Sequence, residues 1–231
     1  MVARLAWSAG RVPAVTWVFV TATRPVESRE GAIRKARRFN RLTIAWNVAE
    51  AVVALAAGIA AGSVSLVGFG LDSCIEVSAS VILAWRLHQE TRGGCMAEND
   101  KRAQRAIAVS FGLLAAYVLV TAGRDLVGGA RPEASPVGIA VAALSLLLMP
   151  VLARAKRRLA PALGSRAVES EADQTSLCAM LSAVLLVGLG LNALFGWWWA
   201  DPVAGLVIGG LAAAAAVRAW RADALVDTCC G

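Results

Sequence analysis

Between Gly62 and Trp85 the chain reads GSVSLVGFGLDSCIEVSASVILAW, a run in which Asp72 and Glu76 are the only charges. About 20 apolar residues cross the hydrocarbon core of a bilayer as a helix, so this run is long enough to span it. A bare carboxylate at that depth costs about 2.5–3.5 kcal/mol on insertion scales, and such groups usually face a cavity or a partner. Four positions apart on a helix, the two acids share one face and can converge on one ligand. A divalent cation suits this arrangement best.

The composition extends this interpretation to the whole chain. Of its 231 residues, 58% are hydrophobic, and the mean hydropathy is +0.63. The apolar residues form continuous blocks, which predicts an integral membrane protein without a separate soluble domain. A net charge of +7 would suit nucleic acid, but the Lys and Arg residues cluster at the ends of the blocks, so we expect no nucleic-acid partner. The five cysteines are too few and too scattered for a disulfide framework.

We therefore expect an all-α integral membrane protein with six transmembrane helices, because backbone polar groups in lipid must be satisfied within the segment. The apolar blocks are Leu42–Ala61, Ser65–Trp85, Ala106–Gly123, Val137–Ala153, Ser176–Phe195 and Val203–Trp220. If the helices alternate in direction, most of the flanking basic residues fall on one side, and only Arg124 and Arg131 fall on the other. The positive-inside rule then predicts a multi-pass protein of the cell (inner or plasma) membrane with both termini cytoplasmic.

The expected organisation has three parts. Residues 1–40 form an N-terminal cytoplasmic segment, residues 41–222 a six-helix transport domain in the lipid bilayer, and residues 223–231 a short cytoplasmic tail. The fifth helix is expected to begin before its apolar core, because residues 167–175 are rich in Ala and Glu and contain no helix breaker. Asp201-Pro202 is a good start for the sixth helix, with the aspartate capping its free amides.

Polar residues of three helices are expected at one depth of the membrane. Glu50 is the only charge of the first block and lies about 16 Å below the outer end of its helix, against about 14 and 20 Å for Asp72 and Glu76. In the fifth block, Gln174, Cys178 and Ser182 form an i, i+4, i+8 stripe, and Cys178 lies about 25 Å from the outer end. Asp173 sits beside this stripe at the cytoplasmic edge.

These groups predict a metal site. Carboxylates and a thiolate suit Zn²⁺, whereas Mg²⁺ and Ca²⁺ prefer shells made of oxygen alone. Mn²⁺, Fe²⁺ and Cd²⁺ remain possible as transported ions. Because carboxylates and a thiol must lose protons before they bind metal, uptake of the ion and release of protons are linked. The candidate ligands are Asp72, Glu76, Gln174, Cys178, Asp173 and Glu50. For Glu50, bracing the helix bundle or relaying protons is as good an interpretation as binding the ion.

The second block resembles the second helix of the cation diffusion facilitators, in which small residues precede Asp-x-x-x-Asp. Trp199-Ala-Asp201-Pro202, at the start of the sixth helix, also matches, and the resemblance covers about residues 40–222. It implies a homodimeric exporter that moves divalent metal out of the cytosol in exchange for protons by alternating access. It also implies that the protein is not an enzyme. Asp72 and Glu76 match the two acids of that helix.

The chain departs from that family in two respects. The fifth-helix pair of the family is His or Asp followed four residues later by Asp, and Gln174 and Cys178 occupy those places here, with Asp173 adjacent. The cytoplasmic metal-binding domain typical of the family is expected to be missing, so that the membrane helices must hold any dimer. The resemblance is thus to a divergent member with the membrane domain only.

Two other classes of protein remain open. A proton-coupled exporter of organic cations could use Glu50 and Glu76 as counter-charges, although such a pocket should have aromatic walls. An intramembrane aspartyl protease is suggested by Gly68-Phe-Gly70-Leu-Asp72, which has one residue more than the Gly-x-Gly-Asp signature. That enzyme also needs a second membrane aspartate on a neighbouring helix. Flux of metal, efflux of dye and cleavage of a peptide would distinguish the three.

Overall fold

The computed structural model describes residues 29–90, 97–163 and 166–221, and all of its regular structure is helical. The expected tail at residues 223–231 and residues 1–28 of the N-terminal segment lie outside this part of the chain. The helices are α1 (Arg29–Ala61), α2 (Val64–Glu90), α3 (Ala97–Gly128), α4 (Pro136–Leu163), α5 (Arg166–Phe195) and α6 (Ala200–Arg221). The prediction of an all-α protein with six membrane helices is therefore confirmed.

All six helices are long and apolar enough to cross a membrane. At about 1.5 Å per residue, even the 22-residue α6 reaches the roughly 30 Å that a span requires. The outward faces carry large apolar side chains, such as Ile59, Leu113, Leu147 and Leu194, which are 73%, 68%, 72% and 79% exposed. Surfaces of this kind are stable against lipid tails and unstable against water.

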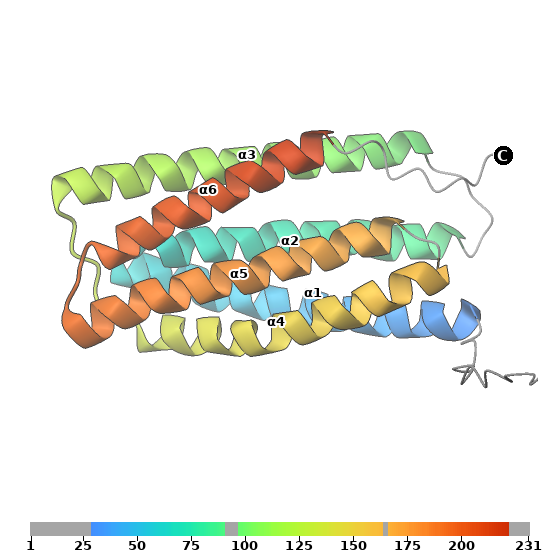
Figure 1. Ribbon diagram of the computed structural model, residues 1–231, viewed down its shortest axis with the longest axis horizontal. Helices are drawn as coiled ribbons and strands as arrows, with labels where there is room; N and C mark the ends of the chain where they lie inside the picture. Colours follow the sequence, from blue (N-terminus) through green and yellow to red (C-terminus); the bar gives the residue numbers. More distant parts are fainter. Residues whose placement is uncertain (1–28, 91–96, 164–165, 222–231) are drawn as a thin grey trace, which may run out of the picture.

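The helices form a four-helix group with a helix pair beside it. Helix α1 packs against α2 and α4, and α5 packs against α4 and α2, so these four close a ring. Helix α3 packs chiefly against α6, and this pair lies along the α2–α5 side of the ring (Figure 1). Helix α2 touches both groups and has the largest buried share of the six spans, 61%. A polar side chain on α2 therefore meets protein on most sides.

Tight turns join the helices at one end of the bundle, which we call the glycine end. Here α1, α3 and α5 finish, each followed by a glycine with a positive φ angle: Gly62, Gly129 and Gly196. After α1, the amide of Ser63 donates to the carbonyl of Gly58 at 3.0 Å, and after α3 the amide of Ala130 donates to that of Asp125 at 3.0 Å. This pattern closes a helix and needs the left-handed conformation that glycine adopts without strain.

The opposite end, which we call the basic end, holds the start of α1 and the finish of α2, α4 and α6. The helices run further towards this end than the apolar blocks do. Helix α1 begins at Arg29, so its basic run lies within the helix. Helix α5 begins at Arg166, as predicted from its Ala/Glu-rich lead-in. A small apolar cluster, which includes Ala32, Leu83, Leu159 and Val168, joins α1, α2, α4 and α5 there.

Candidate functional site

The two acids of α2 lie in the interior of the bundle. Asp72 and Glu76 are each 3% exposed, one helical turn apart, and they interact electrostatically with each other. The helix turns them away from lipid because α2 is surrounded by α1, α3, α5 and α6. Charged groups buried in a region of low dielectric interact strongly and are costly without partners. These two carboxylates are therefore the first candidates for the centre of a cation site.

Glu50 of α1 joins them from the neighbouring helix. Its side chain is 2% exposed and lies within electrostatic range of both α2 acids. The hydroxyl of Ser145, on α4, donates a hydrogen bond to Glu50 Oε1, and the indole Nε1 of Trp46 donates to that hydroxyl at 2.9 Å. Glu50 is thus held by α4 while it faces α2. Three carboxylates consequently share one region of the interior.

The fifth helix contributes a thiol and an amide. Cys178 is fully buried and interacts electrostatically with Glu76, Glu50 and Asp72. Gln174 lies one turn nearer the basic end, and its side-chain Oε1 is buried without a hydrogen-bond partner in the described part of the chain. The second carboxylate oxygens of Glu50 and Glu76 are likewise buried without a partner there. Buried acceptors of this kind are rare in proteins, and they suit a cation.

These side chains surround a common region but do not form a ready coordination shell. Across the residues that the structure describes, no three His, Cys, Asp or Glu side chains stand close enough together to hold one ion. The acids interact with one another electrostatically, and Cys178 is also in hydrogen-bond contact with Glu76. The geometry is therefore that of an acidic interior and not of a preformed coordination shell.

The structure does not bring Asp173, the remaining candidate ligand, to this region. Its side chain is 66% exposed and forms an ion pair with Arg157 of α4 at 2.7 Å. Two further polar residues of α5, Ser182 and Asn192, bond to backbone carbonyls and not to the acids. The hydroxyl of Ser182 donates to the carbonyl of Cys178 in its own helix, and Asn192 donates to the carbonyl of Pro132 at the glycine end.

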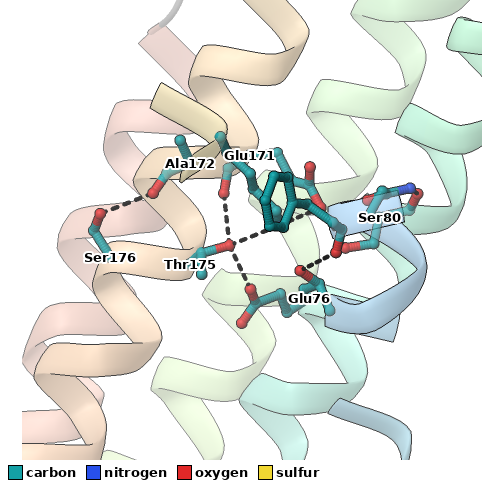
Figure 2. A network of polar contacts seen from close by, with 10 residues as sticks. Glu76, Ser80, Glu171, Ala172, Thr175 and Ser176 are labelled. Carbon is teal, nitrogen blue, oxygen red and sulfur yellow. Dashed lines mark hydrogen bonds and ion pairs between the residues drawn. The ribbon is translucent and has the colours of Figure 1, made fainter. Parts of the chain in front are cut away.

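Three polar residues that the sequence analysis did not single out form a cluster that reaches Glu76 through Thr175. Lys156 of α4 is 2% exposed, and its ammonium group lies 2.9 Å from Glu171 Oε1 of α5, which is 3% exposed. Thr175, fully buried, donates a hydrogen bond to Glu76 Oε1 at 2.7 Å (Figure 2). The signal for this cluster was the short connection between α4 and α5. In an antiparallel hairpin, residues equally far from the turn lie side by side, which pairs the 156–157 region with 171–173.

Asp201 has a different partner from the one expected. Instead of capping its own helix, its carboxylate accepts hydrogen bonds from the hydroxyls of Ser63, at 2.6 Å, and Ser65. Ser63 also caps α2, since its hydroxyl accepts the amide of Leu66 at 3.2 Å. Asp201 is 1% exposed, so the start of α6 is fastened to the start of α2 inside the glycine end. The distant serines outcompete the local amides because they, too, are buried and need a partner.

A comparison with protein families agrees with this architecture. Residues 104–225, more than half of the chain, match the model of the cation efflux transmembrane domain. The match begins in α3 and includes Lys156, Glu171, Thr175 and Cys178, whereas α1 and α2 precede it. Together with six spans and a buried acidic interior, this match makes the protein a multi-pass membrane transporter of metal cations. The chain belongs to the cation efflux family.

Proposed function

We propose that this protein exports divalent metal ions, with Zn²⁺ favoured, in exchange for protons. One observation carries the proposal: Glu50, Asp72, Glu76 and Cys178 are buried in one electrostatically connected region although they come from three helices. Several carboxylates are not buried together for stability, because each pays a desolvation cost and repels the others. A divalent cation would offset both penalties.

The donor set favours a borderline or soft ion. A thiolate with carboxylate oxygens is a ligand combination that Zn²⁺ accepts, and Cd²⁺ accepts it as well. Gln174 adds an amide oxygen one turn from Cys178 on the same helix, and this Oε1 is buried without a partner among the described residues. Asp173 is left out of the proposed ligand set because it is exposed and paired with Arg157.

Exchange for protons follows from the same donor chemistry. Carboxyl and thiol groups bind a metal only after they lose their protons, so each loading event releases protons and each unloading event takes them up. If the groups load on one side of the membrane and unload on the other, metal and protons move in opposite directions. Alternating access would provide this, because two conformations expose one site to opposite sides in turn.

The assignment of the acids is tested by flux into proteoliposomes loaded with a fluorescent zinc indicator. We expect Asp72→Asn and Glu76→Gln each to reduce Zn²⁺ flux to the level of protein-free liposomes, because each substitution keeps the shape and removes the charge. Glu133→Gln, an exposed acid between α3 and α4, is the matched control and should keep wild-type flux. Undiminished flux in Asp72→Asn would refute the assignment.

The exchange is tested by imposing a pH gradient across the same liposomes. An inward-directed zinc gradient should drive protons out of the liposomes. An outward-directed proton gradient should accelerate zinc uptake, and an inward-directed proton gradient should slow or stop it. Metal flux that ignores an imposed proton gradient would remove the exchange mechanism and leave the metal site standing.

The arrangement in the cell is also part of the proposal. We place the basic end in the cytoplasm, since Arg34, Arg38, Arg158 and Arg221 lie there while Arg124 and Arg131 lie near the glycine end. Both termini would then be cytoplasmic in the cell membrane. We also expect a homodimer held by its membrane helices, which native mass spectrometry from nanodiscs would detect as twice the chain mass.

A further inference from the structure

The α4–α5 hairpin contains two ion pairs that differ sharply in burial. Arg157 and Asp173 pair at the surface, with side chains 55% and 66% exposed. Lys156 and Glu171 pair in the interior, each 3% exposed, at a distance of 2.9 Å. The surface pair already links the two helices. A second pair in the interior needs another reason, because desolvating two charges costs about as much as their attraction returns.

The buried pair is connected to the proposed metal site through Thr175. The ammonium group of Lys156 donates to Thr175 Oγ1 at 3.0 Å, and the same hydroxyl donates to Glu76 Oε1 at 2.7 Å. Figure 2 shows the hydroxyl of Thr175 on α5 directed at Glu76 of α2, with Glu171 on the other side of it. Lys156 is thus joined to Glu76 by a single bridging hydroxyl.

Glu171 fixes where the ammonium group sits. Its Oε1 accepts from Lys156 and also from the hydroxyl of Ser80, on α2, while its Oε2 is buried without a partner in the described chain. Ser80 is itself tied to α1, since its carbonyl accepts the side-chain amide of Asn40 at 2.8 Å. Groups from four helices therefore hold Lys156 one hydroxyl away from Glu76.

The electrostatic effect of the pair on Glu76 does not cancel. The ammonium group of Lys156 shares the Thr175 hydroxyl with Glu76, whereas the Glu171 carboxylate reaches that hydroxyl only through Lys156, so the pair presents its positive member to Glu76. A metal ion that binds Glu76 must do so against this field, in an interior where charges interact strongly. The ammonium group and the metal consequently act as rivals for one carboxylate.

We propose that Lys156 is a tethered cation that competes with the transported metal for Glu76, and so limits how tightly the site holds it. The inference rests on the proposed function. In the empty protein the ammonium group supplies part of the positive charge that the acids need. When metal binds, repulsion from Lys156 weakens its hold, which keeps release fast. Lys156 acts through Thr175 and is a positioning residue, not a ligand.

The test compares metal affinity and transport in a charge-neutral pair. In Lys156→Met with Glu171→Gln, net charge is unchanged and neither member of the pair is left buried without the other. We expect the dissociation constant for Zn²⁺, measured by competition with a chelator, to fall about tenfold, and the maximal flux to fall as well. The matched control is Arg157→Met with Asp173→Asn, the exposed pair one step along the same hairpin, which should keep wild-type values.

Two further variants separate this role from a structural one. Thr175→Val removes the bridging hydroxyl at constant shape, and should tighten zinc binding in the same direction but by less. Lys156→Arg keeps the charge and should keep wild-type affinity. A purely structural pair would lower the thermal midpoint and leave the zinc dissociation constant unchanged in both Thr175→Val and the neutral pair. That result would overturn the inference.

Failure of this inference and failure of the proposed function give different results. If wild-type protein binds no zinc, and Asp72→Asn binds as poorly, the metal site itself is wrong. If wild-type protein binds zinc and Asp72→Asn loses it, but the neutral pair and Thr175→Val bind like wild type, the site stands and Lys156 does not compete for it.

Discussion

The thiol of Cys178 is the one soft donor among the buried acids, so we expect it to set the order of preference among metals. A serine in its place offers a harder oxygen of similar size. In Cys178→Ser, the preference for Cd²⁺ over Mn²⁺ should fall about tenfold, or about 1.4 kcal/mol, because soft ions lose most when sulfur is replaced. Competition between the two ions in a flux or binding series measures this ratio.

Cys74 provides the matched control for that experiment. It lies on α2 between the two acids, but its side chain faces outward and is exposed. Cys74→Ser should therefore leave the metal series unchanged. If Cys178→Ser gives the same series as Cys74→Ser and wild type, then Cys178 does not bind the ion.

For single residues, the isolated acids could be identified from the sequence, but their partners could not. Glu50, Asp72 and Glu76 could be found because each interrupts an apolar block. The choice between Asp173 and Gln174 could not be made, since neighbours on a helix differ by about 100° in direction and the face of α5 depends on how it packs. Lys156 looked like one of several basic residues that end a span. Only the hairpin geometry shows that it turns inward while Arg157 turns out.

The existence of the six helices was predictable from the sequence, but their lengths were not. Continuous apolar blocks identify the spans, because lipid forces their backbones into helices. The ends differ because a helix continues into polar sequence until something stops it. Helix α1 reaches back to Arg29, and α4 extends through Lys156 to Leu163. This extension at the basic end is what carries Lys156 and Glu171 into the bundle.

The contact between α5 and α6, which joins the helix pair to the four-helix group, depends on close approach at Gly188. A Cβ atom there would lie 2.6 Å from the Cβ of Ala204 and 3.2 Å from the carbonyl oxygen of Ala200. Gly188→Ala should therefore force the helices apart and lower the free energy of unfolding by about 1–3 kcal/mol. The measurement is the thermal midpoint in detergent, together with zinc flux.

Gly190, half a turn further along α5, is the control for this substitution. A Cβ atom there would meet nothing within 4 Å, and alanine is the better helix former. Gly190→Ala should keep or slightly raise the thermal midpoint. A Gly188→Ala protein as stable as Gly190→Ala would show that α5 and α6 can shift without cost, and that their spacing is not fixed by this glycine.

Across the whole molecule, polarity is unequal on the two sides of the acids. Towards the glycine end, Leu66, Phe69 and Leu185 are fully buried, and the polar cluster of Ser63, Ser65 and Asp201 lies beyond them at the starts of α2 and α6. Towards the basic end lie Asn40 and Asn47, which are also buried and have side-chain atoms without partners in the described chain. Polar groups line an approach more readily than Leu and Phe do, because they can replace the water that an ion sheds. We therefore expect the ion to approach the acids from the basic end.

The orientation of the molecule decides which compartment that approach serves, and we expect the basic end to face the cytoplasm. The test uses a background in which Cys95, Cys229 and Cys230 are replaced by serine. In that background, Glu133→Cys, an exposed position between α3 and α4, should react with a membrane-impermeant maleimide in intact cells. Glu169→Cys, an exposed position in the first turn of α5 at the basic end, should react only after permeabilisation. The reverse pattern would invert the molecule, so that the basic end, and with it the approach to the acids, would face the outside.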